Sequence, residues 1–184
     1  DYIVDVKHMS LDLAYEDSTA LILNAGKIND GVGNAAQLTL PSPGKANSLS
    51  ANKAIVIDNV APSILKVAEG STTPNNDADY QGISTLLDLA WSGSDSISGM
   101  YKYEYGLGTT VGGIETISWT DPTQSTNTTV SLTGLSLTDG TTYFAVVRAT
   151  DKAGNMSVER AGDGILIDLT QPSAGSVKDG TGRD

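Results

Sequence analysis

Carboxylates are the side chains of this sequence whose types and spacing could do chemistry. Asp58 and Asp168 each end a run of three apolar residues, and a proline follows each aspartate four positions later. Calcium is a hard cation that takes carboxylate and carbonyl oxygens, so both aspartates are candidate calcium ligands. Residues that could join Asp58 are Asp30, Asn59 and Glu69, and residues that could join Asp168 are Asp151, Asp163 and Asp179.

The sequence offers little support for catalytic chemistry. A serine triad needs a histidine, and the only one is His8; there are no cysteines for a thiolate nucleophile, a disulfide or a thiolate metal site. The glycines of the stretch 106–113 do not follow the phosphate-loop pattern. We interpret the remaining acids as solvated loop or strand-edge groups: Asp12, Asp17, Asp77, Asp79, Asp88 and Asp95. We therefore predict that this chain is not an enzyme.

The net negative charge of the chain limits which partners it can bind. Asp and Glu total 22 against 11 Lys and Arg, which gives a net charge of −11. Nucleic acids and anionic membranes need a basic surface, so neither is expected as a partner. The acidity either keeps the chain soluble or serves calcium binding. No stretch approaches the roughly 18 apolar residues of a membrane span, so we expect no membrane insertion in this segment.

An internal repeat organises the chain. Residues 55–58, Ile-Val-Ile-Asp, align without gaps on residues 165–168, Ile-Leu-Ile-Asp, 110 positions later, and a Pro-Ser pair follows both. An apolar run that ends before a proline is typical of a last strand and a stiff link to the next domain. We predict the C-terminal part of one domain at 1–58, a complete domain at 60–168 and the start of a third at 172–184.

Short strands separated by turns are predicted throughout the complete domain. Glycine and the small polar residues recur every few positions, and apolar residues lack a sustained helical spacing. In the stretch 143–150 we expect Tyr143 and every second residue after it to face the core. The predicted strands are 63–68, 83–91, 100–106, 115–119, 128–132, 142–150 and 165–168, a number that suits a Greek-key sandwich.

One stretch carries a family resemblance. Residues 132–157, which include Leu-Thr-Asp-Gly-Thr-Thr-Tyr-Phe and Ala-Thr-Asp-Lys-Ala-Gly-Asn, resemble the second half of a fibronectin type III-like repeat of large bacterial surface proteins. Residues 11–62 look like the end of another immunoglobulin-like repeat. The resemblance implies tandem Greek-key sandwiches, a tyrosine corner formed by Leu137 and Tyr143, and Trp91 as the central core aromatic.

Two functions are compatible with this resemblance. The first is a structural or adhesive rod in a secreted or surface-anchored protein, an adhesin-like region whose partners are neighbouring repeats, other surface proteins or glycans, with calcium at the domain junctions. The second is a carbohydrate-binding module of a secreted polysaccharide-active enzyme, with a sugar-stacking platform of Tyr80, Tyr101, Tyr105 and Trp119. The incomplete first domain would expose a strand edge, which predicts pairing with another chain.

Overall fold

The computed structural model describes residues 4–5, 7–121 and 125–175. The chain divides into two compact units. The first unit contains Asp1–Ser63, Ser94–Tyr101 and Thr150–Ser157, and the second contains Ile64–Gly93, Lys102–Ala149 and Val158–Asp184. The domain boundaries that we drew from the sequence stay predictions, and most of the expected third domain, residues 176–184, lies outside the described residues.

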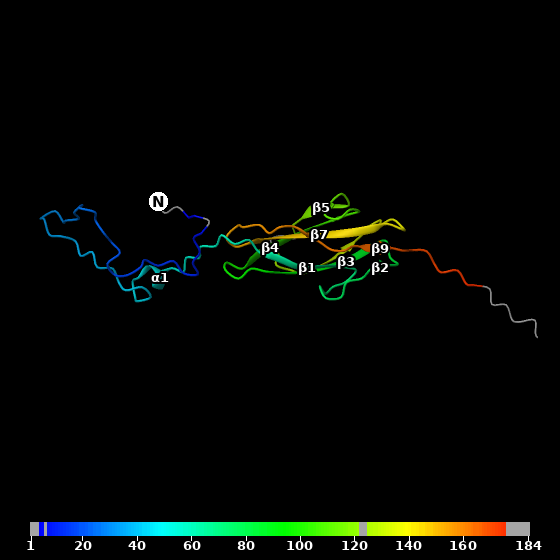
Figure 1. Ribbon diagram of the computed structural model, residues 1–184, viewed down its shortest axis with the longest axis horizontal. Coiled ribbons are helices and arrows are strands. Elements are labelled where there is room, and N and C mark those ends of the chain that lie inside the picture. Colours follow the sequence, from blue (N-terminus) through cyan, green and yellow to red (C-terminus); the bar gives the residue numbers. More distant parts are fainter. Residues whose placement is uncertain (1–3, 6, 122–124, 176–184) are drawn as a thin grey trace, which may run out of the picture. The chain divides into compact units, whose positions relative to one another are not determined.

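Two sheets form a β-sandwich (Figure 1). One sheet has the order β1 (Ser63–Glu69), β3 (Leu86–Ser94) and β6 (Thr129–Thr133). The other has the order β2 (Tyr80–Gln81), β9 (Ile165–Ile167), β7 (Thr142–Asp151), β4 (Met100–Gly108) and β5 (Ile117–Thr120), with β8 (Arg160–Ala161) paired to β7. The seven longer strands are divided between the sheets as in an immunoglobulin-like or fibronectin type III-like sandwich.

Strand pairing places the aliphatic residues of β3 in the core. β3 and β6 run antiparallel, with Leu86 opposite Thr133 and Ala90 opposite Thr129. Leu87 and Leu89 are fully buried, because alternate residues of a strand point to the same face. Asp88, between them, accepts a hydrogen bond from the Ser131 hydroxyl of the neighbouring strand.

Trp91 is the central aromatic of this core, as the resemblance implied. It is fully buried, and its ring lies 5.6 Å from the ring of Tyr105 and 6.0 Å from that of Tyr103. Tilted aromatic pairs at these separations stabilise a core beyond the area that they bury. Three large rings therefore fill the space between sheets that are otherwise lined with aliphatic side chains.

β7 confirms the face that we expected to be buried. Tyr143, Ala145, Val147 and Ala149 are all buried, although Val146 on the opposite face is buried as well. The tyrosine corner is also present, since the backbone N–H of Thr138 donates a 3.1 Å hydrogen bond to the Tyr143 hydroxyl. This bond fixes the loop that leads into β7.

All seven predicted strands have a counterpart in the structure. The largest shift is in β3, which begins at Leu86 rather than at residue 83. Before Leu86, the Ser84 carbonyl oxygen accepts a hydrogen bond from the Leu137 N–H, in the loop after β6. The Gln81 side-chain amide donates a hydrogen bond to the Leu86 carbonyl oxygen, where the strand begins. The sequence did not predict β2 and β8, which are two residues long each and too short to show a periodicity. Between β8 and β9 lies Gly164, whose φ of +95° favours glycine.

The N-terminal stretch of the first unit has little regular structure. Its residues carry a short helix, α1 (Leu49–Asn52), and the isolated bridges Ser10–Ile57 and Asn29–Ala35. Many of its apolar side chains are exposed, and Ile57 is the buried exception among the large ones described before residue 58. No helix among the described residues is long and apolar enough to cross a membrane.

Candidate metal centres

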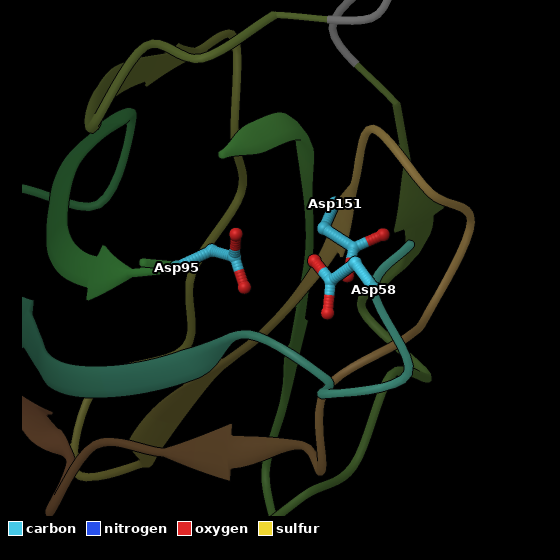
Figure 2. Close-up of side chains that lie close together, drawn as sticks. All are labelled: Asp58, Asp95 and Asp151. Atoms are coloured by element: carbon cyan, nitrogen blue, oxygen red, sulfur yellow. The ribbon is translucent and has the colours of Figure 1, made fainter. Parts of the chain in front are cut away.

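Three aspartates gather in the first unit. Asp58 precedes β1, Asp95 follows β3 and Asp151 ends β7, and one carboxylate oxygen of each lies within 4.8 Å of the other two. Figure 2 shows the three carboxylates turned towards one another. Asp58 and Asp151 are buried. We name these residues the Asp58 cluster.

Backbone donors hold Asp58 in this cluster. Its Oδ1 accepts a 2.8 Å hydrogen bond from the Val60 N–H, and its Oδ2 accepts a 3.0 Å bond from the Ser98 N–H. Burial alone would raise the pKa of Asp58, but the hydrogen bonds from Ser98 and Val60 outweigh it and hold the pKa below its ordinary value. Asp58 is therefore a satisfied, ionised carboxylate at neutral pH.

The other two members are the first residues of tight turns. Asp95 Oδ1 accepts bonds from the N–H groups of Ile97 (3.2 Å) and Gly99 (2.6 Å). Asp151 Oδ1 accepts bonds from the N–H groups two and four residues later, and its Oδ2 accepts one from the Asn155 side-chain amide. The same Asn155 amide also donates to the Asp58 carbonyl oxygen at 3.0 Å. These side chains thus tie three segments together.

A second group of acids lies in the second unit. Glu69 ends β1, Asp77 lies in the following loop and Asp163 precedes β9, and one carboxylate oxygen of each lies within 4.8 Å of the other two. Glu69 is fully buried, whereas Asp77 and Asp163 are exposed. We name these residues the Glu69 cluster.

Glu69 carries the largest electrostatic cost of this cluster. Its Oε1 accepts a 2.8 Å bond from the Ala145 N–H, but its buried Oε2 has no hydrogen-bond partner among the described residues. Burial raises the pKa of Glu69 to about 7, and the negative charges of Asp77 and Asp163 add to the shift, while the backbone N–H groups of Ala145 and Gly164 partly oppose it. Burial and the adjacent Asp163 carboxylate also raise the pKa of Asp77.

The structure pairs the predicted calcium ligands differently from the sequence. Asp58 and Asp151 were expected at separate junctions but share one cluster, and Glu69 and Asp163 share the other. Asp95 and Asp77, which we had read as solvated, complete the two clusters. Only the packing of distant strands could reveal these partners.

Three other candidates lie outside both clusters, and a fourth, Asp179, lies outside the described residues. Asp168 is exposed and accepts a bond from the Thr170 N–H. Asp30 forms an exposed turn that repeats the Asp151 turn, with Oδ1 bonded to the N–H groups of Val32 and Asn34. The Asn59 amide donates to the carbonyl oxygens of Asp5 and His8 and does not face the Asp58 carboxylate.

The expected sugar platform is wrong in one of its members. Tyr105 is a buried core residue that packs on Trp91 and cannot stack on a sugar. Trp119 is half-buried, and the Arg148 guanidinium lies 4.2 Å above its ring. Tyr80 and Tyr101 remain exposed.

Comparisons with known proteins add little to this picture. No protein-family model matches the chain, and no curated protein matches it. Among solved structures, the chain is similar to the twitchin kinase region from C. elegans (Fn31-NL-kin-CRD-Ig26), with a TM-score of 0.33 and 20% identity. The match covers 53% of this chain and 16% of the twitchin chain.

Proposed function

We propose that this chain is a structural, adhesive segment of a larger secreted or cell-surface protein, in which serial sandwiches act as a spacer. Such arrays gain length because each domain contacts only its neighbours. The tandem arrangement, the extracellular location and the adhesin-like role are parts of this proposal. The internal repeat supports it, because the Asp-x-x-x-Pro link occurs before β1 and again after β9.

The observation that carries the proposal is the position of the two chain segments that lead into β1 and out of β9. Before β1, the Asp58 carbonyl oxygen accepts a bond from Asn155, in the turn after β7. After β9, the Leu169 N–H donates a 2.7 Å bond to Asp139, in the turn before β7. β7 has ten residues and spans roughly 33 Å at the usual rise of a strand. Entry and exit at opposite ends of one long strand are what a spacer domain needs.

Calcium at the Asp58 cluster belongs to the same proposal. A shared ion would fix the segment that leads into β1 to the turns at 95–99 and 151–155. None of the described ion pairs involves these three aspartates, so no basic side chain is seen to neutralise them. Calcium accepts the carboxylate and carbonyl oxygens that this cluster offers.

Force spectroscopy on the 184-residue chain, held at its two ends, tests the spacer role. We expect one cooperative unfolding event for residues 63–167, with a gain in length of about 300 Å at 3.3–3.6 Å per residue. Gradual extension without such an event would contradict a sandwich that resists mechanical force.

A glycan array tests the competing function of a carbohydrate-binding module. We expect no saccharide binding that depends on the exposed aromatic residues. Binding that is lost in both Tyr80→Ala and Trp119→Ala, but kept in a Tyr15→Ala control from the other unit, would favour the carbohydrate-binding module instead.

A further inference from the structure

We propose that Glu69, Asp77 and Asp163 bind one calcium ion, at a site inside the second unit that is separate from the Asp58 cluster. This site goes beyond the spacer function, because it would exist in a single sandwich with no neighbouring repeat. The proposal rests on geometry and on a buried oxygen that has no hydrogen-bond partner in the described part of the chain.

The geometry of the three oxygens suits calcium. Oxygen ligands lie roughly 2.3–2.6 Å from a calcium ion, so two ligands of one ion are at most about 5 Å apart. The oxygens from Glu69, Asp77 and Asp163 all lie within 4.8 Å of one another. Asp77 and Asp163 are exposed, which leaves water free to supply the remaining ligands of a six- to eight-coordinate ion.

The buried oxygen gives the independent evidence for a ligand. Glu69 has no exposed surface, and its Oε2 lacks a hydrogen-bond donor among the described residues. A buried polar atom without a partner costs about 1–3 kcal/mol, and native structures rarely tolerate it. A cation between Glu69 and the two aspartates would satisfy this oxygen and remove the repulsion among three carboxylates.

The backbone around Glu69 is arranged to keep the carboxylate in place. Gly162 donates its N–H to the Ala145 carbonyl oxygen at 2.9 Å, and a side chain at Gly162 would begin 2.2 Å from both Glu69 oxygens. Asp77 is held on the other side, because its Oδ1 accepts a 2.7 Å bond from the Glu69 N–H. The room for Glu69 and the position of Asp77 are therefore built into the fold.

Two basic residues lie near this cluster. Lys66 and Arg160 line the pocket that opens beside Asp77 and Asp163. Lys66 donates to the Asn75 side chain, and none of the described ion pairs joins either basic residue to the three carboxylates. Neither residue therefore takes the place of a cation at Glu69.

Thermal unfolding of the full chain, stripped of metal and then titrated with calcium, tests the site. The variants are Glu69→Gln and the milder, exposed Asp163→Asn, and the matched control is Asp79→Asn, an exposed aspartate two residues from Asp77. At ten times the dissociation constant, calcium should raise the midpoint by about 5 °C in the unsubstituted chain and in Asp79→Asn. Asp163→Asn should lose the part of the rise that the Glu69 cluster contributes, and calorimetric titration should show one calcium ion fewer bound.

An Asp95→Asn variant separates this site from the Asp58 cluster. A calcium response that survives Asp95→Asn, and is lost when Asp163→Asn is added to Asp95→Asn, supports the Glu69 site. A response that Asp95→Asn abolishes and Asp163→Asn leaves intact overturns it, as does no calcium response in any of the chains. Magnesium alone should give a smaller shift, because it needs shorter, octahedral coordination; a larger shift with magnesium would overturn the assignment to calcium.

Discussion

The two carboxylate clusters of this protein differ in how their oxygens are satisfied. In the Asp58 cluster, each aspartate accepts hydrogen bonds from backbone N–H groups, and these bonds hold the pKa of Asp58 below its ordinary value. In the Glu69 cluster, one oxygen of a fully buried glutamate has no hydrogen-bond donor among the residues that the structure describes, and burial raises the pKa of Glu69 to about 7. The acids of the Asp58 cluster therefore stabilise turns, whereas those of the Glu69 cluster destabilise the fold electrostatically unless a cation binds to them.

The largest expected effect is the pH dependence of the Glu69 cluster without calcium. The folded chain holds a proton on Glu69 up to about pH 7, whereas the unfolded chain releases it near 4.5. The contribution of Glu69 to the free energy of unfolding should therefore be most favourable below pH 4.5 and fall by about 3 kcal/mol as the pH rises through 7. Urea unfolding in metal-free buffer across this range measures the fall, and a slope that Glu69→Gln does not reduce would contradict the assignment.

Gly162→Ala should displace the Glu69 carboxylate, because the backbone at residue 162 lies against it. The new Cβ would lie 2.2 Å from both carboxylate oxygens of Glu69, so either the Glu69 side chain or the backbone at residue 162 must move. We expect a loss of about 2 kcal/mol in the free energy of unfolding. The control is Gly82→Ala, whose Cβ would have ordinary contact at 3.6 Å; equal losses in the two variants would show that the Glu69 carboxylate is not tightly packed.

Asp58→Ala should show how much a carboxylate that accepts backbone hydrogen bonds contributes to the free energy of unfolding. It leaves the N–H groups of Val60 and Ser98 without their acceptor, so we expect a loss of about 1.5 kcal/mol at pH 7. Because the pKa of Asp58 is lowered from 3.8, its contribution is complete above pH 3.8 and lost as the pH falls further. The exposed repeat partner supplies the control, since Asp168→Ala should change the free energy by less than about 0.5 kcal/mol.

The smallest expected effect concerns the turn that occurs twice in the chain. Asp30 and Asp151 accept the same pattern of backbone bonds, but Asp30 is exposed and belongs to neither cluster. Asp151→Ala should lower the unfolding midpoint of the sandwich, and Asp30→Ala should leave it unchanged. Equal shifts, measured by circular dichroism, would show that the turn itself matters and its place in the cluster does not.

The sequence alone determined the main strands of this protein. Alternating apolar residues and turn residues predicted the seven main strands and the buried face of β7, because these features depend on neighbours within about ten positions. The tyrosine corner at Tyr143 was implied by the family resemblance of residues 132–157. The repeat at Asp58 and Asp168 pointed to carboxylates as the chemistry to look for. Tyr105 shows the limit of such reasoning, since a strand tyrosine has no local signal that tells core from surface.

Only the tertiary structure decided which acids meet. Asp95 and Asp151 reach Asp58 because three segments, up to 93 residues apart, end at the same place. Glu69 is buried because β1 packs on the sheet of β7, where the Ala145 N–H supplies a bond and Gly162 supplies the space. Carboxylates far apart in the sequence have no pattern that links them, since their distance depends on strand order and packing rather than on local periodicity.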